Sequence, residues 1–137
     1  MDNKEILRHV DHTLLKATAS RADIKKLCEE AVMYHTASVC VPPCYIKRIH
    51  DAYGGRVNIC TVIGFPLGYS VTSAKVEEAR AALADGANEI DMVINVGKLK
   101  SGDYDYVLAD IEKVVDAASE YGSIVKVILE TGLLTTE

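Results

Sequence analysis

Residues 86–95 read GANEIDMVIN and place acidic side chains inside an otherwise apolar run. Side chains of a strand alternate between its two faces, so one face of this segment is wholly aliphatic and consists of Ile90, Met92 and Ile94. The opposite face is mostly polar and consists of Glu89, Asp91, Val93 and Asn95. Either a parallel strand facing a polar interior or an antiparallel strand with one solvated face explains this pattern. The position of the segment in the chain decides between them.

Length and composition restrict the class of protein. A chain of 137 residues with 49% hydrophobic content can bury one substantial core, so we expect a single unit over residues 1–137. The net charge is −5 and the 15 basic residues are dispersed, which argues against a nucleic-acid partner. No apolar run approaches the length of a membrane span, so we expect no membrane partner and a cytoplasmic location. The four cysteines indicate reduced thiols.

Short apolar strands alternate with helical patterns along the chain. The predicted strands are residues 10–14, 37–41, 57–65, the segment around Asp91, and 124–131. Helices are predicted to begin at Ser20, at Pro42-Pro43, at Thr72 and at Tyr104. Ser20 is followed three residues later by Asp23, which is typical of a capping box. Gly86 stands where a glycine commonly ends the preceding helix.

A strand–helix repeat predicts parallel strands joined by helical crossovers, in an open sheet or a barrel. Central strands of an open sheet are aliphatic on both faces, because helices cover both. Several strands here carry polar groups on one face, namely Asp11 and Thr13, Ser38 and Cys40, Asp91 and Asn95, and Lys126 and Glu130. The lumen of a (β/α)₈ barrel produces that asymmetry. We therefore predict an α/β fold that is part of a TIM barrel, with five parallel strands and four helices.

A closed eight-stranded barrel usually needs at least about 200 residues, so this chain is little more than half of one. Residues 135–137, Thr-Thr-Glu, are typical of a helix start, although frayed terminal residues would look the same. We expect barrel strands six to eight to be absent. A five-stranded segment has two unpaired edges, so we expect it to form a homodimer or to pair with the missing barrel segment.

Five segments of this chain occur together in one family. They are VDHTLLK at 10–16, ASVCVPP at 37–43, TVIGFPLG at 61–68, GANEIDMVIN at 86–95 and VKVILET at 125–131. In this order and spacing they resemble deoxyribose-phosphate aldolase, over essentially the whole chain but only the first part of the barrel of that family. Any one of these motifs alone would be weakly specific.

The resemblance implies a class I aldolase that cleaves 2-deoxyribose 5-phosphate to acetaldehyde and glyceraldehyde 3-phosphate, without a metal or organic cofactor. In that chemistry a lysine forms a Schiff base with the carbonyl, and the iminium accepts electrons from the breaking carbon–carbon bond. Asp91 matches the carboxylate of the family that shuttles protons, and Lys126 matches a lysine of the same pocket. Asp11, Thr13 and Cys40 match lumen-facing positions near the substrate.

The same resemblance implies what residues 1–137 lack. The Schiff-base lysine of the family lies on the sixth strand, its second catalytic lysine on the seventh, and its phosphate site in the last two loops. We therefore expect negligible aldolase activity from the isolated chain. Two alternatives stay open: a non-catalytic half-barrel that self-associates, and residual carbonyl chemistry with Lys126 as a substitute nucleophile.

Asp91 and Lys126 are expected to meet, because adjacent strands lie about 4.8 Å apart. Their attraction would lower the pKa of the acid and raise that of the amine, which suits a proton relay, although a purely structural ion pair would do the same. Glu130 could compete with Asp91 for Lys126. We predict no metal site, because His9 and His12 do not share a helical face and neither Cys40 nor Cys44 belongs to a cluster in the sequence.

Overall fold

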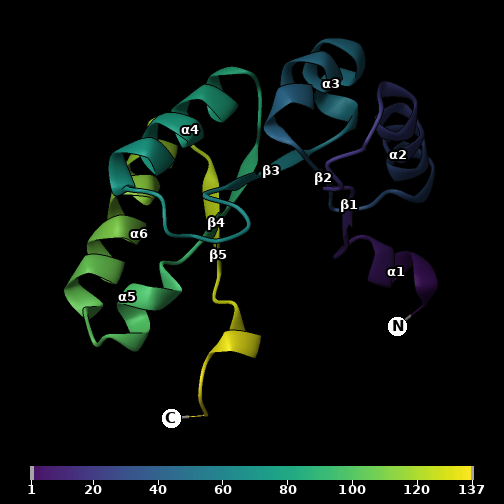
Figure 1. The fold of residues 1–137 in the computed structure, drawn as a ribbon. Coiled ribbons are helices and arrows are strands. Elements are labelled where there is room, and N and C mark those ends of the chain that lie inside the picture. Colours follow the sequence, from purple (N-terminus) through teal and green to yellow (C-terminus); the bar gives the residue numbers. More distant parts are fainter. Residues whose placement is uncertain (1, 137) are drawn as a thin grey trace.

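Five parallel strands form one sheet in the computed structural model, which describes residues 2–136 (Figure 1). The strands are β1 (Asp11–Thr13), β2 (Ser38–Val41), β3 (Ile59–Ile63), β4 (Glu89–Val93) and β5 (Ile124–Ile128). They lie side by side in chain order, and each neighbouring pair is parallel. Strands added one after another with helical crossovers are the pattern of a (β/α) barrel, so the predicted arrangement is confirmed.

Six α-helices lie within residues 2–136, two more than the sequence predicts. They are α1 (Asn3–Leu7), α2 (Arg21–Tyr34), α3 (Ile46–Tyr53), α4 (Thr72–Ala84), α5 (Val96–Lys100) and α6 (Tyr104–Ser119). Short 3-10 turns are η1 (Pro43–Tyr45), η2 (Gly54–Arg56) and η3 (Thr131–Leu133). The two additional helices, α1 and α5, have five residues each. A helix of that length is too short to display a 3.6-residue hydrophobic period, which is why the pattern missed them.

Local chemistry sets the ends of two predicted helices. Ser20 accepts a hydrogen bond from the backbone N–H of Asp23, and the Asp23 carboxylate accepts one from the Ser20 backbone, which confirms the capping box at the start of α2. After α4 the chain turns at Gly86 with a φ of 109°. A Cβ there would lie 2.5 Å from the His50 ring, so only glycine fits this turn.

Four strands are shorter than predicted. β3 ends at Ile63, because Gly64 has a φ of 62° and begins a loop. β5 ends at Ile128, and Glu130 takes the left-handed conformation with a φ of 55° before η3. Glu130 is therefore not on the polar face of the last strand, which corrects the prediction. The expected helix start at 135–137 includes Glu137, which lies outside the described residues.

Side chains of the sheet separate onto two faces as the alternation predicts. The outer face packs against α2, α3, α4 and α6, and its fully buried strand residues include Val39, Val41, Ile59, Ile63, Ile90 and Met92. Burying one such side chain contributes about 1.5–3 kcal/mol, so this layer is the main source of stability. The inner face holds a small cluster of Cys40, Cys60 and Val62 beside the charged residues.

The inner face is concave. Four strand spacings of about 4.8 Å would put β1 and β5 about 19 Å apart in a flat sheet. Instead, Lys126 Nζ on β5 lies 2.5 Å from Asp11 Oδ2 on β1. A lysine side chain cannot span the flat distance, so the sheet curls and its two outer strands approach each other across the inner face. This curvature is that of part of a barrel.

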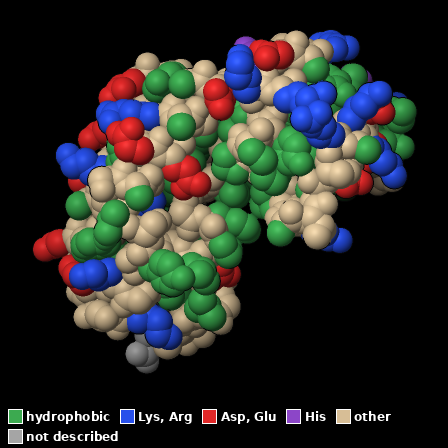
Figure 2. All heavy atoms as spheres, turned by 45° about the horizontal axis from the view of Figure 1, so that its top comes forward, with side chains coloured by type: hydrophobic (Ala, Val, Ile, Leu, Met, Phe, Trp, Pro, Cys, Tyr) green, Lys and Arg blue, Asp and Glu red, His purple; other side chains and the backbone are tan. Residues whose placement is uncertain are grey.

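The outer surface carries both signs of charge. In Figure 2, Lys and Arg side chains occur with Asp and Glu side chains over the helices, and hydrophobic side chains gather between the two helix groups. Figure 1 places α2 with α3 in one group and α4 with α6 in the other. In the described part of the chain, none of the helices combines the length and hydrophobicity that crossing a membrane requires.

Candidate active site on the concave face

Strand register places polar side chains of segments that are distant in the sequence side by side on the inner face. Asp91 on β4 is the register partner of Lys126 on β5. At the opposite edge of the sheet, Asp11 on β1 is the partner of Ser38 on β2. The predicted meeting of Asp91 and Lys126 is therefore confirmed as geometry, and the backbone ladder that creates it is continuous through all five strands.

Lys126 is the centre of the site and faces three carboxylates. Its Nζ lies 2.5 Å from Asp11 Oδ2, 3.0 Å from Asp91 Oδ1 and 3.4 Å from Glu89 Oε2. The lysine side chain is 37% exposed, so the cluster is open to solvent and to small molecules on its concave side. One ammonium among three carboxylates leaves the face with an excess of negative charge. The partner of Lys126 is thus Asp91 together with Asp11 and Glu89, and not Glu130.

The ion pairs change the acid–base behaviour of both partners. Burial alone would lower the pKa of Lys126, but its contacts with Asp11 and Asp91 outweigh burial and raise that pKa above its ordinary value. Burial alone would raise the pKa of Asp11, but hydrogen bonds from Lys126 and Ser38 hold it below its ordinary value. At neutral pH the lysine is therefore an ammonium and Asp11 a carboxylate. An ammonium can donate or relay a proton, but it cannot attack a carbonyl.

Neighbouring polar groups orient the carboxylates. Ser38 Oγ donates to Asp11 Oδ1 over 2.7 Å, and Asn58 Nδ2 donates to Glu89 Oε1 over 2.8 Å. Thr13 is exposed, and its hydroxyl donates to the backbone oxygen of Asp11. Asp11 therefore belongs to the cluster, whereas the Thr13 hydroxyl is bonded to the backbone of its own strand, and its predicted place near the substrate stays a prediction.

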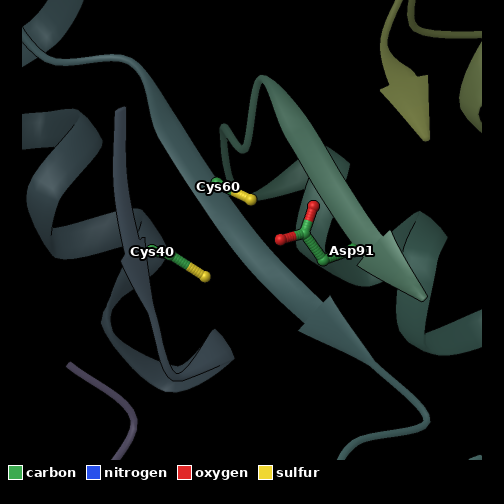
Figure 3. A group of neighbouring side chains, drawn as sticks. All are labelled: Cys40, Cys60 and Asp91. Carbon is green, nitrogen blue, oxygen red and sulfur yellow. The ribbon is translucent and has the colours of Figure 1, made fainter. Parts of the chain in front are cut away.

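Two thiols lie beside the charged cluster on the same face. Cys40 on β2 and Cys60 on β3 are register partners, and both are buried. Their Sγ atoms and a carboxylate oxygen of Asp91 lie within 4.8 Å of one another (Figure 3). The adjacent Cys40 thiol and burial together raise the pKa of Cys60. Cys40, Cys60 and Asp91 are the residues of this face that could hold a metal ion.

A second charged network lies on the outer face and was not predicted. Lys75 on α4 is fully buried, and its Nζ lies 2.5 Å from Asp110 Oδ2 of α6 and 2.9 Å from the backbone oxygen of Val93. Thr72 Oγ1 donates to the other oxygen of Asp110 over 2.8 Å. The sequence does contain an indication of this network. Asp110 lies between Val107 and Val114 on the apolar face of α6, and a charged side chain buried on such a face requires a partner.

Glu89 is a further residue of the site that sequence reasoning did not select. It lies on the polar face of the β4 segment, two residues before Asp91, so the alternation of side chains carried the signal. Its contact with Lys126 spans two adjacent strands, in the same way as that of Asp91. The resemblance assigned no role to this position. The alternation places Glu89 and Asp91 on the same face but does not tell which of them has a role in the site.

The fold and the concave charged face define the class, a parallel (β/α)-barrel segment with its polar groups in the lumen. The family model of the DeoC/LacD family aldolases matches residues 6–137, so the chain belongs to this family. Two curated deoxyribose-phosphate aldolases from Clostridium botulinum, strains Alaska E43 and Eklund 17B, are 56% and 57% identical to it over 137 residues. The alignments cover all of this chain and 61% of each relative.

A solved structure agrees with the fold. The deoxyribose phosphate aldolase from Aeropyrum pernix, described as a tetramer, matches with a TM-score of 0.88 and 33% sequence identity. The match covers 96% of this chain and 55% of that structure. The chain thus spans about three fifths of the length of the curated relatives and a little over half of this solved neighbour.

Proposed function

We propose that residues 1–137 form the N-terminal, proton-handling segment of a class I aldolase that cleaves 2-deoxyribose 5-phosphate to acetaldehyde and glyceraldehyde 3-phosphate. The observation that carries this proposal is the Lys126 ammonium held between Asp91 and Asp11 on a concave, solvent-open face. The names of the relatives over the matched residues support the choice of substrate. The substrate is a sugar phosphate, both products are aldehydes, and the proposed reaction uses no organic cofactor.

The proposed roles follow from the charges. When an iminium has formed on the substrate, the electron pair of the breaking bond moves into it and leaves an enamine. The hydroxyl of the departing aldehyde loses its proton as its carbonyl forms. The enamine takes up a proton at its β-carbon, the carbon next to the former iminium carbon, which restores the iminium for hydrolysis. We assign this proton traffic to Asp91, acting through a water molecule. Lys126 holds the carboxylate in place and supplies a proton donor beside it. Asp11 keeps Lys126 charged, and Cys40 borders the substrate space.

Lys126 itself is a poor candidate for the Schiff-base nucleophile. A nucleophilic lysine must be neutral, and the raised pKa of Lys126 keeps it protonated at neutral pH. We therefore assign the nucleophile, the second catalytic lysine and the phosphate site to a C-terminal barrel segment that carries strands six to eight, outside residues 1–137. On this proposal the isolated 137-residue chain has negligible aldolase activity.

The outer strands supply the surface for that segment. β1 and β5 are the ends of the sheet, and Ile124 on β5 is exposed together with Leu129 and Leu133, which follow it. We propose that these edges pair with the C-terminal segment or, in its absence, with a second copy of the chain. The same exposed apolar residues favour a second candidate function, a non-catalytic half-barrel that self-associates.

Borohydride trapping separates these possibilities. The chain is incubated with acetaldehyde and borohydride, alone and with the C-terminal part of the Clostridium botulinum relative, and adducts are located by peptide mass spectrometry. We expect an adduct only on the C-terminal partner, together with restored cleavage of 2-deoxyribose 5-phosphate. An adduct on Lys126 in the isolated chain would contradict the assignment of the nucleophile. No adduct and no activity in either sample would support the half-barrel instead.

Two variants test the residue roles in the reconstituted complex. Asp91→Asn removes the proton acceptor and should lower kcat/KM by about 10²- to 10⁴-fold. Asp116→Asn is the matched control, because Asp116 is exposed on α6, and it should leave kcat/KM unchanged. Equal activity of the two variants would show that Asp91 has no role in proton transfer.

Light scattering of the isolated chain tests whether its unpaired strand edges cause self-association. A stable monodisperse monomer would exclude self-association.

A further inference from the structure

Cys40, Cys60 and Asp91 form a compact donor set, and neither of its two thiols takes part in the proposed proton transfer. The three residues come from β2, β3 and β4, and Figure 3 shows their side chains on the same face of the sheet, directed toward a common space. The two thiols are almost completely buried, with 3% exposure for Cys40 and 0% for Cys60. Two sulfur atoms and one carboxylate oxygen are therefore held together by the strand register.

The spacing suits a tetrahedral ion. With zinc–sulfur bonds of about 2.3 Å and zinc–oxygen bonds of about 2.1 Å, ligand atoms of one tetrahedral site lie about 3.6–3.8 Å apart. The three donor atoms here lie within 4.8 Å of one another. A contraction of about 1 Å closes that gap, which side-chain rotation provides without moving the strands.

The Asp91 carboxylate has room for a further ligand. Its buried Oδ1 has an ion-pair partner in Lys126 Nζ, 3.0 Å away, and no hydrogen-bond donor besides it within residues 2–136. A carboxylate offers about four lone-pair positions, so this one contact leaves acceptor positions that a bound ion can take.

The surrounding charge favours a cation. Asp11, Glu89 and Asp91 face the single ammonium of Lys126, so the four side chains carry an excess of negative charge. Lys126 would repel an ion beside Asp91, but its side chain is partly exposed and keeps two other carboxylates as partners. The ammonium can therefore stay paired with Asp11 and Glu89 while the ion takes Asp91.

We propose that Cys40, Cys60 and Asp91 bind one thiophilic divalent cation, Zn²⁺ or Cd²⁺, with the fourth position open to water. Thiolate ligands select such ions over Mg²⁺ and Ca²⁺, which require oxygen donors. Both thiols lose their protons on binding, so each bound ion releases two protons to solvent. Because the ion occupies the carboxylate of Asp91, it blocks this face, and binding is inhibitory wherever Asp91 handles protons.

Cadmium titration of the reduced 137-residue chain tests the site directly, without any activity measurement. Thiolate coordination produces a charge-transfer absorption band, which should saturate at one Cd²⁺ per chain with two protons released. Cys60→Ala and Asp91→Asn should each weaken binding by about 100-fold or more, since the loss of a direct ligand exceeds that of a supporting residue. Cys44→Ala and Cys28→Ala are matched controls and should bind as the parent chain does.

The controls separate this site from the other thiols. Cys44 is exposed on η1, and Cys28 is buried against the outer face of the sheet. Absorption that survives in a Cys40→Ala, Cys60→Ala double variant, or that disappears in Cys44→Ala, would overturn the proposal. So would an absence of absorption in the parent chain, which would leave the two thiols as core residues. Circular dichroism of each variant excludes loss of folding, and Asp91→Asn changes no core volume.

Discussion

Two buried or half-buried lysines lie on opposite faces of the same sheet and have different surroundings. Lys75, on the outer face, is fully buried and has one carboxylate partner, Asp110. Lys126, on the concave face, is partly exposed and has three carboxylate partners. Both side chains contact strand β4 or its end, since Lys75 donates to the backbone oxygen of Val93 and Lys126 contacts Asp91.

The difference separates a structural network from a chemically usable one. Lys75 donates to Asp110 and to the backbone oxygen of Val93, and Thr72 donates to the second oxygen of Asp110. The buried ammonium and both carboxylate oxygens therefore have partners, and we call this network closed. Around Lys126 the carboxylate oxygens outnumber the N–H donors, and solvent has access. A ligand can therefore replace one of the contacts between Lys126 and a carboxylate, and we call this network open. The closed network holds the end of the strand that carries Asp91, because Val93 follows Asp91 by two residues.

The largest expected effect comes from breaking the closed network. Asp110→Ala leaves the buried Lys75 ammonium without a counter-charge and should lower the free energy of unfolding by about 3–5 kcal/mol, measured by urea denaturation. Asp51→Ala is the matched control, because its pairing with Lys47 is exposed, and it should cost no more than about 0.5 kcal/mol. A similar loss of unfolding free energy in both variants would show that the buried pair of Lys75 and Asp110 contributes no more than the exposed pair of Lys47 and Asp51.

The next effect comes from the turn that covers Lys75. Gly64 has a φ of 62°, and a Cβ there would lie 2.8 Å from Lys75 Cε. Gly64→Ala should destabilise the chain by about 1–2 kcal/mol through the left-handed backbone alone, with displacement of Lys75 in addition. Gly55→Ala has no atom within 4 Å of the new Cβ and serves as the control in the same urea experiment. An unchanged midpoint for Gly64→Ala would mean that the turn adapts.

The open network should matter less for stability than for chemistry. Lys126→Met removes an ammonium that is partly exposed, so the free energy of unfolding should fall by about 1 kcal/mol or less. Activity in the reconstituted complex should nevertheless decrease strongly, because Asp91 loses its partner. Lys25→Met, in an exposed pair on α2, is the control for both measurements. A loss of stability as large as that of Asp110→Ala would make the two networks equivalent.

The smallest effect is a pH dependence of the open network. The pKa of Asp11 lies below its ordinary value of 3.8, so the stability it contributes is present above that pH and is lost as the pH falls through the folded pKa. The pKa of Lys126 lies above its ordinary value of 10.5, so its contribution is present below that pH and is lost as the pH rises through the folded pKa. At neutral pH, between the acid loss and the alkaline loss, Asp11 and Lys126 therefore both contribute to stability.

Asp11→Asn tests the acid side of this window. The free energy of unfolding, measured by urea denaturation near about pH 7 and about pH 3, should change less with pH for Asp11→Asn than for the parent chain, by a few tenths of a kcal/mol. Asp116→Asn is the control and should keep the full acid dependence of the parent. An acid dependence that is the same for all three proteins would show that the Asp11 contact with Lys126 does not contribute to stability.

Much of the fold and part of the site could be predicted because they depend on local patterns. Alternation along residues 86–95 placed Asp91 on the inner face, and the same rule placed Lys126 on the inner face of the next strand. Nearest-neighbour pairing then brought the two together. The ends of β3 and β5 were predicted too far along the chain, because apolar residues continue past Gly64 and Ile128 into turns that the pattern does not distinguish from strands.

Two other contacts were not predicted, one between register partners on adjacent strands and one between two helices. Cys40 and Cys60 are twenty positions apart and have no spacing motif, so no metal site was expected from them. Asp110 on an apolar helix face indicated that a partner was needed, but not that the partner was Lys75 on another helix. Each of these contacts depends on how whole elements pack together, and a one-dimensional pattern does not contain that information.

The amino-acid sequence by itself determined the order of the strands and the main helices, the face on which Asp91 and Lys126 lie, and the aldolase family. These follow from side-chain period and from motifs of a few residues. Only the tertiary structure decided that Asp11 on the first strand reaches Lys126 on the last, and that two thiols lie beside Asp91. The physical reason is curvature and register, which arise from the packing of all five strands against the outer helices.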